Sequence, residues 1–281
     1  MVKLISELKD IILAIFDLDG VIYRGNQLIP QVDTIIQDLK KESIDVVYNS
    51  NNSTATRKAY VKRLNDMNIQ CERGDFYTSA SITASEISKI KPNANIFVIG
   101  EIGLREELKA QGHKIITKEK QYESVDFVIA GLDRNFTYKN LAIAQRCILD
   151  GKAKFYATNA DSTLPSEDRL MPGAGVMINA IETCTNQPPL KTFGKPNPFG
   201  IKSILEERNI EPEKACIFGD RLNTDIIAGN RAGIKTIVIL TGVTTKKDID
   251  KLKRKAKKYD SVKKDLIPDL ILENLNNIFQ H

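Results

Sequence analysis

Histidine is scarce in this chain: of its 281 residues, only His113 and His281 are histidines. We therefore expect any acid–base catalysis to use carboxylates, because histidine, the side chain that ordinarily titrates near neutral pH, is so scarce. Long apolar runs are also lacking, and no segment approaches the roughly 20 residues that cross a membrane. The amino-terminal residues include Lys3, Glu7 and Lys9 and show no apolar signal region, so we expect a cytoplasmic protein without membrane contact.

The cysteines show no metal-binding arrangement. They have neither CxxC spacing nor a nearby histidine pair, which argues against a structural zinc site and indicates reduced, mostly buried thiols. They are Cys71, Cys147, Cys184 and Cys216.

The net charge of +5 comes from one segment of the chain. Residues 246–265 contain ten lysines or arginines and four aspartates, an excess of six positive charges that leaves the rest at about −1. We interpret this segment as a solvated helix face rather than a polyanion-binding patch. We therefore expect no nucleic-acid partner.

Residues 11–23, with the sequence IILAIFDLDGVIY, form an apolar run that ends in two aspartates. Such a run is typical of a buried parallel strand, and ligands bind at the carboxyl ends of these strands. Asp17 and Asp19 would repel each other there, so a metal ion, a proton or a basic neighbour has to relieve the repulsion. Alone, the Asp-x-Asp-Gly pattern also fits a turn that ends a strand, or a calcium loop.

The apolar patterns that follow predict an α/β fold with a parallel sheet. Residues 24–30 indicate a turn or small hairpin, residues 32–39 have helical spacing, and residues 44–48 form a second strand. This β-α-β order favours parallel strands. From residue 78 to about 189 the pattern restarts, which indicates a second α/β layer inserted into the first.

Two further polar clusters follow predicted strands. The cluster 49–54 offers hydroxyl and backbone N–H groups to an anion, although Ser53 or Thr54 could simply cap the next helix. The strand at 215–218 ends in a glycine and Asp220, with Asp225 at the start of the next helix and Thr224 as its cap.

Lys195 lies between these clusters, in the segment GKPNP, where Asn197 suits a helix N-cap and Pro198 the first helical position. If the three strands are neighbours in a parallel sheet, Lys195 and the carboxylates converge on one crevice. Oxygen ligands of this kind suit Mg²⁺, which often bridges carboxylates to a phosphate.

The segments FDLDGVIY, SNNST, GKPNP and GDRLNTDI, in this order, resemble the four motifs of the haloacid dehalogenase superfamily phosphatases. The segment TNADSTLPSEDRLMPGAG before GKPNPFG is similar to the NagD-type branch, which includes p-nitrophenyl and phosphoglycolate phosphatases. The resemblance implies a Rossmann-like, doubly wound core at 1–78 and 190–281. It also implies an inserted α/β cap domain of type IIA at 79–189.

The resemblance also implies a reaction, the hydrolysis of phosphate monoesters of small metabolites. Asp17 would be the nucleophile that forms an aspartyl-phosphate, and Asp19 the general acid and base, with its pKa raised by burial and by Asp17. Mg²⁺ would be held by Asp17, the Asp19 backbone carbonyl and Asp220. A hydrolytic dehalogenase needs no acid at the position of Asp19, because halide leaves unprotonated. The presence of Asp19 therefore favours phosphate esters as substrates.

Other residues of the motifs would hold the phosphate or support the site. Ser50, Asn51, Asn52 and Lys195 would bind the phosphoryl oxygens, and Asp225 would orient Lys195 or a metal-bound water. Gly20 and Gly219 would support the loops. Two positions depart from the family pattern: Ser50 stands where threonine is frequent, and Asn223 where an acid is frequent.

The cap would close over the site and supply contacts to the leaving group. The candidates are Asp133, Arg134, Asn159, Asp161 and Arg169, and for each a plain surface turn is an equal alternative. Two other functions stay open: a phosphoryl transferase or mutase acting on a sugar phosphate, and a non-catalytic metabolite-binding protein. A homodimer also stays open, because caps in this branch can mediate dimers.

Overall fold

The computed structural model describes residues 3–165, 169–258 and 264–280. The chain forms two compact units, which are described separately. The first unit comprises Met1–Ser50, Val61–Tyr77 and Lys195–His281. The second unit comprises Asn51–Tyr60 and Thr78–Gly194.

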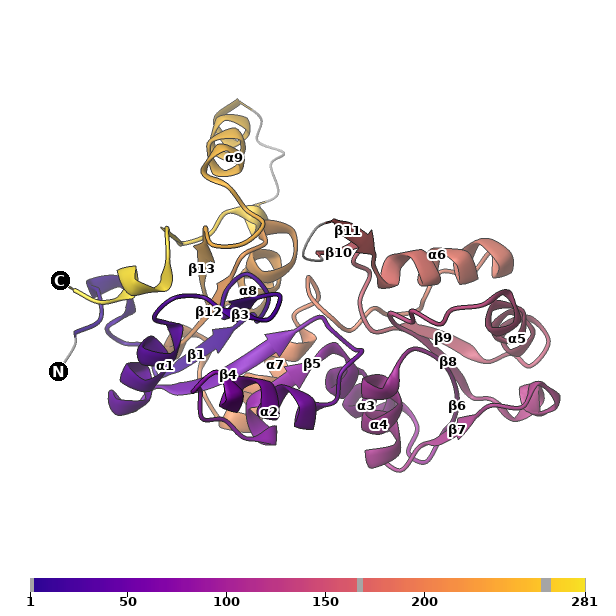
Figure 1. Ribbon diagram of the computed structural model, residues 1–281. Coiled ribbons are helices and arrows are strands. Elements are labelled where there is room, and N and C mark those ends of the chain that lie inside the picture. Colours follow the sequence, from indigo (N-terminus) through magenta and orange to yellow (C-terminus); the bar gives the residue numbers. More distant parts are fainter. Residues whose placement is uncertain (1–2, 166–168, 259–263, 281) are drawn as a thin grey trace. The chain divides into compact units, whose positions relative to one another are not determined.

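A six-stranded sheet with the order β14-β13-β12-β1-β4-β5 forms the centre of the first unit (Figure 1). Its strands are β1 (Leu13–Phe16), β4 (Asp45–Ser50), β5 (Phe76–Thr78), β12 (Ala215–Gly219), β13 (Lys235–Ile239) and β14 (Leu270–Leu272). The strands from β14 to β4 pair in parallel. All four residues of β1 are buried, as expected for a strand that is covered on both faces.

Helices and a small hairpin complete this part of the chain. The helices are α1 (Val32–Lys41), α2 (Arg57–Asp66), α7 (Phe199–Arg208), α8 (Ile227–Ala232) and α9 (Lys246–Lys258), and the hairpin strands are β2 (Tyr23–Arg24) and β3 (Gln27–Leu28). In α1 the buried residues are Val32, Ile35, Ile36 and Leu39. Their spacing places them on one face of the helix, which explains why this segment is helical.

A four-stranded sheet with the order β7-β6-β8-β9 forms the second unit (Figure 1). Its strands are β6 (Asn95–Ile99), β7 (Lys114–Ile116), β8 (Phe127–Ala130) and β9 (Lys154–Ala157), and all neighbours pair in parallel. Its helices are α3 (Ser79–Ile90), α4 (Ile102–Ala110), α5 (Tyr138–Leu149) and α6 (Ala174–Thr185), and it also has the hairpin of β10 (Thr163–Pro165) and β11 (Leu170–Pro172). The two parallel sheets confirm the predicted α/β class.

The start of α2 differs from the sequence prediction. Ser53 and Thr54 do not cap it, because the helix begins at Arg57. The hydroxyl of Thr56 instead accepts a hydrogen bond from the Ala59 N–H at 3.2 Å. The sequence prediction named only Ser53 and Thr54 as caps, and the path of the backbone decides which hydroxyl group caps the helix.

Two later helix starts differ as well. Pro198 is the N-cap of α7 rather than its first residue, and Asn197 still accepts the Phe199 N–H at 3.2 Å. Thr224 caps no α-helix, because it lies inside a π-helical turn at Leu222–Ile226 that precedes α8. Such wide turns are rare and frequently occur at functional sites, and no pattern in the sequence predicts them.

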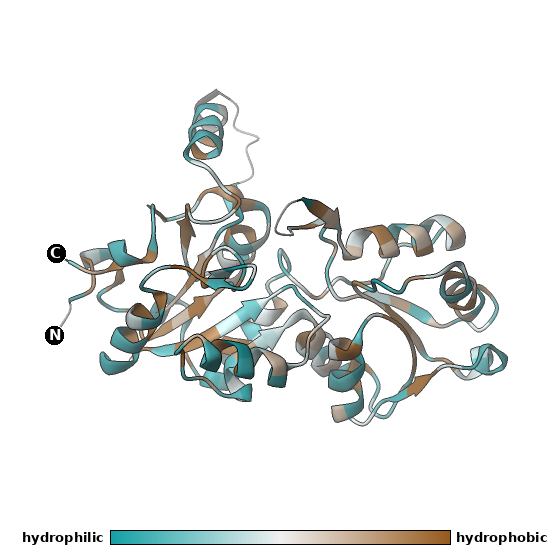
Figure 2. Ribbon diagram, viewed as in Figure 1, coloured by the Kyte–Doolittle hydropathy of each residue, from teal (hydrophilic) through white to brown (hydrophobic). Residues whose placement is uncertain are grey.

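The basic segment predicted to be a solvated helix contains α9. Figure 2 shows hydrophobic colours along strands of both sheets and mostly hydrophilic colours along α9. Residues 259–263 of the basic segment lie outside the described residues. Among the described helices, none has both the length and the apolar character that crossing a membrane requires.

His113 lies buried in the second unit as a neutral ring. The Ala94 N–H donates to its Nδ1 at 3.1 Å, and its Nε2 lies 2.9 Å from the Ser88 Oγ. Ser88 donates its own proton to the Ala84 carbonyl at 3.0 Å, so Nε2 carries the ring proton. A second proton on Nδ1 would face the Ala94 N–H, and burial lowers the pKa of His113.

This neutral histidine predicts a pH effect on stability. Below the ordinary histidine pKa of about 6.5 the unfolded chain binds a proton that the folded chain excludes. The free energy of unfolding of the wild type should therefore fall, relative to His113→Gln, as the pH is lowered from 7.5 to 5.5. Urea denaturation of both proteins at the two pH values measures this, and parallel pH profiles would contradict it.

Candidate active site

Three neighbouring strands of the first unit deliver polar residues to the same edge of the sheet. Strand β1 lies between β4 and β12, and the Asp17 N–H continues the pairing by donating to the Phe218 carbonyl at 2.9 Å. Asp17 follows β1, Ser50 ends β4 and Asp220 follows β12. Because parallel strands end at one edge, all three residues lie at this edge of the sheet, and carboxylate oxygens of Asp17 and Asp220 lie within 4.8 Å of each other.

Lys195 is the centre of this cluster. Its ammonium group lies 2.6 Å from Asp17 Oδ1, 2.6 Å from Asp225 Oδ1 and 2.6 Å from the Asn49 carbonyl. Its side chain is only 4% exposed. Burial alone would lower the pKa of Lys195, but the charges of Asp17 and Asp225 outweigh burial and raise it. Lys195 therefore stays positively charged at the site.

Asp17, Asp220 and Asp225 bring three carboxylates together. One oxygen of each lies within 4.8 Å of the others. Burial, together with the negative charges of Asp225 and Asp220, raises the pKa of Asp17 well above its ordinary value. The positive charge of Lys195 opposes this shift. Burial and Asp225 raise the pKa of Asp220 to about 6. Three carboxylates beside one ammonium group leave an excess of negative charge, and this donor set fits a hard divalent cation.

Asp19 lies two residues beyond the nucleophile candidate. Asp19 is partly exposed to solvent, but burial of its carboxylate by the surrounding protein raises its pKa. The positive charges of Arg63, Arg221 and Lys195 act in the opposite direction and lower it. The sequence predicted this direction and gave burial and Asp17 as the causes. In the structure, burial is the largest cause of the shift.

Two glycines of the motifs have steric reasons to be glycine. Gly20 has a φ of +86°, which other residues rarely adopt, and a Cβ on it would lie 2.6 Å from Asp220 Oδ2. A Cβ on Gly219 would collide with the Asp225 side chain. Both positions therefore let an acid of the site lie directly against the backbone.

The predicted phosphate-binding residues fall in both units. Ser50 is buried at the end of β4 in the first unit, whereas Asn51 and Asn52 belong to the second unit. The Asn51 side chain donates to Asp161 at 3.0 Å, and the Asn52 side chain accepts the Thr54 N–H at 2.8 Å. The side chains of both asparagines thus have contacts within the second unit.

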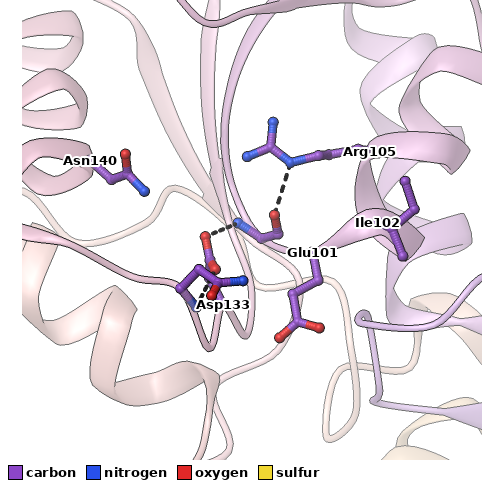
Figure 3. A pocket seen from close by; sticks show the side chains of 7 residues that line it. Glu101, Ile102, Arg105, Asp133 and Asn140 are labelled. Carbon is purple, nitrogen blue, oxygen red and sulfur yellow. Dashed lines mark hydrogen bonds between the residues drawn. The ribbon is translucent and has the colours of Figure 1, made fainter.

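Asp133, one of the predicted cap residues, lines a cavity of about 440 Å³ in the second unit (Figure 3). The cavity is lined by Gly100, Glu101, Ile102, Arg105, Asp133, Asn135 and Asn140. It lies where the strand order reverses between β6 and β8, a usual place for ligands in α/β sheets.

The charged groups at this cavity bind one another or the backbone. Asp133 accepts the Gly100 N–H at 3.2 Å, and Arg105 donates to the Gly100 carbonyl at 3.0 Å, as the dashed lines in Figure 3 show. Arg134 forms an ion pair with Glu101 at 2.6 Å. Contacts within these loops therefore explain the positions of Asp133, Arg105 and Arg134.

The other predicted cap residues lie near the carboxyl end of β9 and in the adjoining hairpin. Asn159 is buried and donates to Asp161 at 2.9 Å, so Asp161 accepts hydrogen bonds from both Asn159 and Asn51. Arg169 is exposed. Asp161 thus connects the second motif to the end of β9.

Sequence reasoning gave no role to several residues that contact the site. Asn49 supplies its carbonyl to Lys195 and donates its side-chain amide to the Tyr77 carbonyl at 3.0 Å. The loop at 241–244, which follows β13, donates the Val243 N–H to Asp220 at 2.7 Å. The sequence signal for the loop at 241–244 was weak, because the loop follows a strand and contains a glycine but carries no charged side chain.

Comparisons with known proteins agree with this geometry. Residues 14–114 match the haloacid dehalogenase-like hydrolase family, and residues 192–274 match the related HAD-hydrolase-like family. An acid sugar phosphatase of Staphylococcus saprophyticus is 35% identical over 237 residues, which cover 84% of this chain and 89% of that protein.

Solved structures agree as well. A p-nitrophenyl phosphatase from Archaeoglobus fulgidus is 30% identical with a TM-score of 0.85, over 95% of this chain and 98% of that one. A 4-nitrophenylphosphatase from Thermotoga maritima is 33% identical with a TM-score of 0.85, over 97% of both chains. The chain belongs to the haloacid dehalogenase-like hydrolases. Within them it falls in the NagD and p-nitrophenyl phosphatase branch, with a type IIA cap.

Proposed function

We propose that this chain is a Mg²⁺-dependent phosphatase that hydrolyses small sugar phosphates through an aspartyl-phosphate on Asp17. Its membership in the branch makes it a phosphoric monoester hydrolase, and the sugar-phosphate class is transferred from the acid sugar phosphatases. The observation that carries the covalent route is the buried Lys195, 2.6 Å from both Asp17 and Asp225. A buried cation between two acids orients a carboxylate for attack on an anionic substrate.

The carboxylate cluster supports a metal site. Asp17, the Asp19 backbone carbonyl and Asp220 would hold Mg²⁺, which prefers oxygen ligands, and Asp225 would orient Lys195. Burial, with a smaller contribution from the neighbouring acids, raises the pKa values of Asp17 and Asp220, and a bound cation would offset the cost of keeping both ionised. When bound, the metal would neutralise charge between the nucleophile and the phosphate.

The chain's own residues would divide the reaction between them. Lys195 holds the Asp17 carboxylate so that its oxygen attacks phosphorus in line with the leaving alkoxide. Asp19, whose pKa is raised, retains a proton that it gives to the leaving oxygen, and then accepts a proton from the attacking water. Ser50 and Lys195 hold the phosphoryl oxygens, and the Asn51 backbone N–H and Asn52 belong to the same predicted phosphate-binding set.

We propose residues 79–189 as the cap domain, with residues 1–78 and 190–281 as the catalytic core. The cap would contact the sugar through Asp133, Arg134, Asn159, Asp161 or Arg169. Asp161 is the best supported of these residues, because it binds Asn51 of the second motif and Asn159. A homodimer and a cytoplasmic location remain predictions, and light scattering on the purified protein measures the first of them.

Phosphate release tests the proposed function. The purified protein should release inorganic phosphate from p-nitrophenyl phosphate and from a panel of sugar phosphates when Mg²⁺ is present, and should stop when EDTA is added. Phosphate and dephosphorylated sugar should appear in equal amounts. A phosphate group that moves to a second sugar instead would indicate a mutase. Binding of sugar phosphates without turnover would indicate a non-catalytic binding protein.

A further inference from the structure

The loop that follows β13 holds Asp220 through its backbone. The Val243 N–H donates to Asp220 Oδ2 at 2.7 Å, and the Thr244 N–H donates to the Asp220 carbonyl at 3.0 Å. Asp220 is almost completely buried. A hydrogen bond to an ionised carboxylate is stronger than one between neutral groups, so this contact fixes the direction of the carboxylate.

Two glycines enclose the same carboxylate. A Cβ on Gly20 would lie 2.6 Å from Asp220 Oδ2 and 3.0 Å from the Gly242 Cα. A Cβ on Gly242 would lie 2.5 Å from the Asp220 Cβ and 2.5 Å from its Cγ. The distances to Asp220 are all below 3.0 Å, which real Cβ atoms essentially never show, so Asp220 can take this position only because both neighbours lack a side chain.

The loop is also tied to the segment that carries Asp17. The Thr241 hydroxyl donates to the Gly20 carbonyl at 2.6 Å. Arg24, in strand β2, donates to the Thr241 carbonyl through Nε at 2.6 Å. The loop therefore connects the end of the first motif, the hairpin and Asp220.

We propose that Gly242 and Val243 are positioning residues that set the direction in which Asp220 binds the metal ion. The proposal rests on the metal site of the proposed function. It adds that the loop after β13 orients Asp220, one of the metal ligands of that site. Val243 acts through its backbone N–H, and the residue is 53% exposed, so the residue type matters little. At Gly242 the residue type matters, because any side chain would displace the carboxylate. Groups that orient metal ligands typically contribute about 10–100-fold to metal affinity.

Metal binding by the intact protein tests the proposal without relying on activity. Mn²⁺ is titrated into metal-free wild type and Gly242→Ala, and free Mn²⁺ is followed by electron paramagnetic resonance. The dissociation constant of Gly242→Ala should be about 10–100-fold larger than that of the wild type. One control should bind as the wild type does. Gly74→Ala adds a methyl group whose nearest neighbour is 3.7 Å away.

Thr241→Val provides a second variant if Gly242→Ala does not fold, as judged by circular dichroism in EDTA. Removing the hydroxyl bond to Gly20 should weaken Mn²⁺ binding by about tenfold, at the low end of the same range. Equal affinities in the wild type and the folded loop variants would overturn the proposal and leave the metal site intact. Absence of Mn²⁺ binding in the wild type would overturn both this proposal and the metal dependence of the proposed function.

Discussion

Asp17→Asn should lower kcat for p-nitrophenyl phosphate by about 10⁴-fold or more, because an amide oxygen is too weak a nucleophile to form the acyl-phosphate. The substitution hardly changes the volume of the side chain. Burial raises the pKa of Asp17, so its ionised form costs stability at neutral pH, and the neutral amide removes that cost. In EDTA at pH 8 the variant should therefore be at least as stable as the wild type.

Steady-state kinetics and thermal denaturation of the same preparation check both parts of this prediction. Asp66→Asn is a matched control, because Asp66 is a surface acid whose side chain is 62% exposed and paired with Lys62. It should keep wild-type activity. An Asp17→Asn protein that is folded and retains a substantial part of the wild-type kcat would contradict the covalent route.

Lys195→Met should reduce both activity and stability. Activity should fall by about 10²–10³-fold, the usual effect of removing one group that stabilises developing charge. Methionine is similar in length but leaves Asp17 and Asp225 buried without the ammonium group that lies 2.6 Å from each. Breaking a buried ion pair from one side costs about 3–5 kcal/mol of unfolding free energy.

The unfolding free energy lost in Lys195→Met should be larger at high pH than at low pH. Without Lys195 the pKa values of Asp17 and Asp220 rise further, so the folded variant binds protons that the unfolded chain releases. The deficit relative to the wild type should be largest at pH 8 and should shrink as the pH falls toward 5. Asp220 already has a pKa of about 6 in the wild type, which places this window in an accessible range.

Urea denaturation in EDTA at pH 8 and pH 5 measures the deficit. Lys62→Met serves as the control, since Lys62 pairs with Asp66 at the surface and its side chain is 76% exposed. That variant should show neither the deficit nor the pH effect. A deficit for Lys195→Met that stays constant with pH would indicate lost packing rather than uncompensated charge.

Much of the fold followed from apolar patterns in the sequence. The strands at β1, β4 and β12 were recognisable because a strand buried on both faces must be continuously apolar. The polar residues after each of them marked the strand ends, and the βαβ order made the strands parallel. The convergence of Asp17, Lys195 and Asp220 could therefore be predicted from sheet geometry.

The parts that could not be predicted depend on the backbone. The loop containing Gly242 and Val243 contacts Asp220 through an N–H that every residue except proline possesses, so no residue type signals it. The π-helical turn that contains Thr224 and Asp225 has no sequence pattern either. The contacts of Asp161 with Asn51 join residues 110 positions apart, which only the folded chain brings together.

Trapping the phosphorylated enzyme tests the central claim most directly. Asp19→Asn, which lacks the base that activates water, is mixed with Mg²⁺ and with p-nitrophenyl phosphate labelled in its phosphate, whose leaving group departs without a proton, then quenched in acid and reduced with borohydride. Peptide mass spectrometry should then find homoserine at position 17, because borohydride reduces an acyl-phosphate to an alcohol. Turnover with aspartate intact at position 17 and the label on another residue, or on none, would contradict the account.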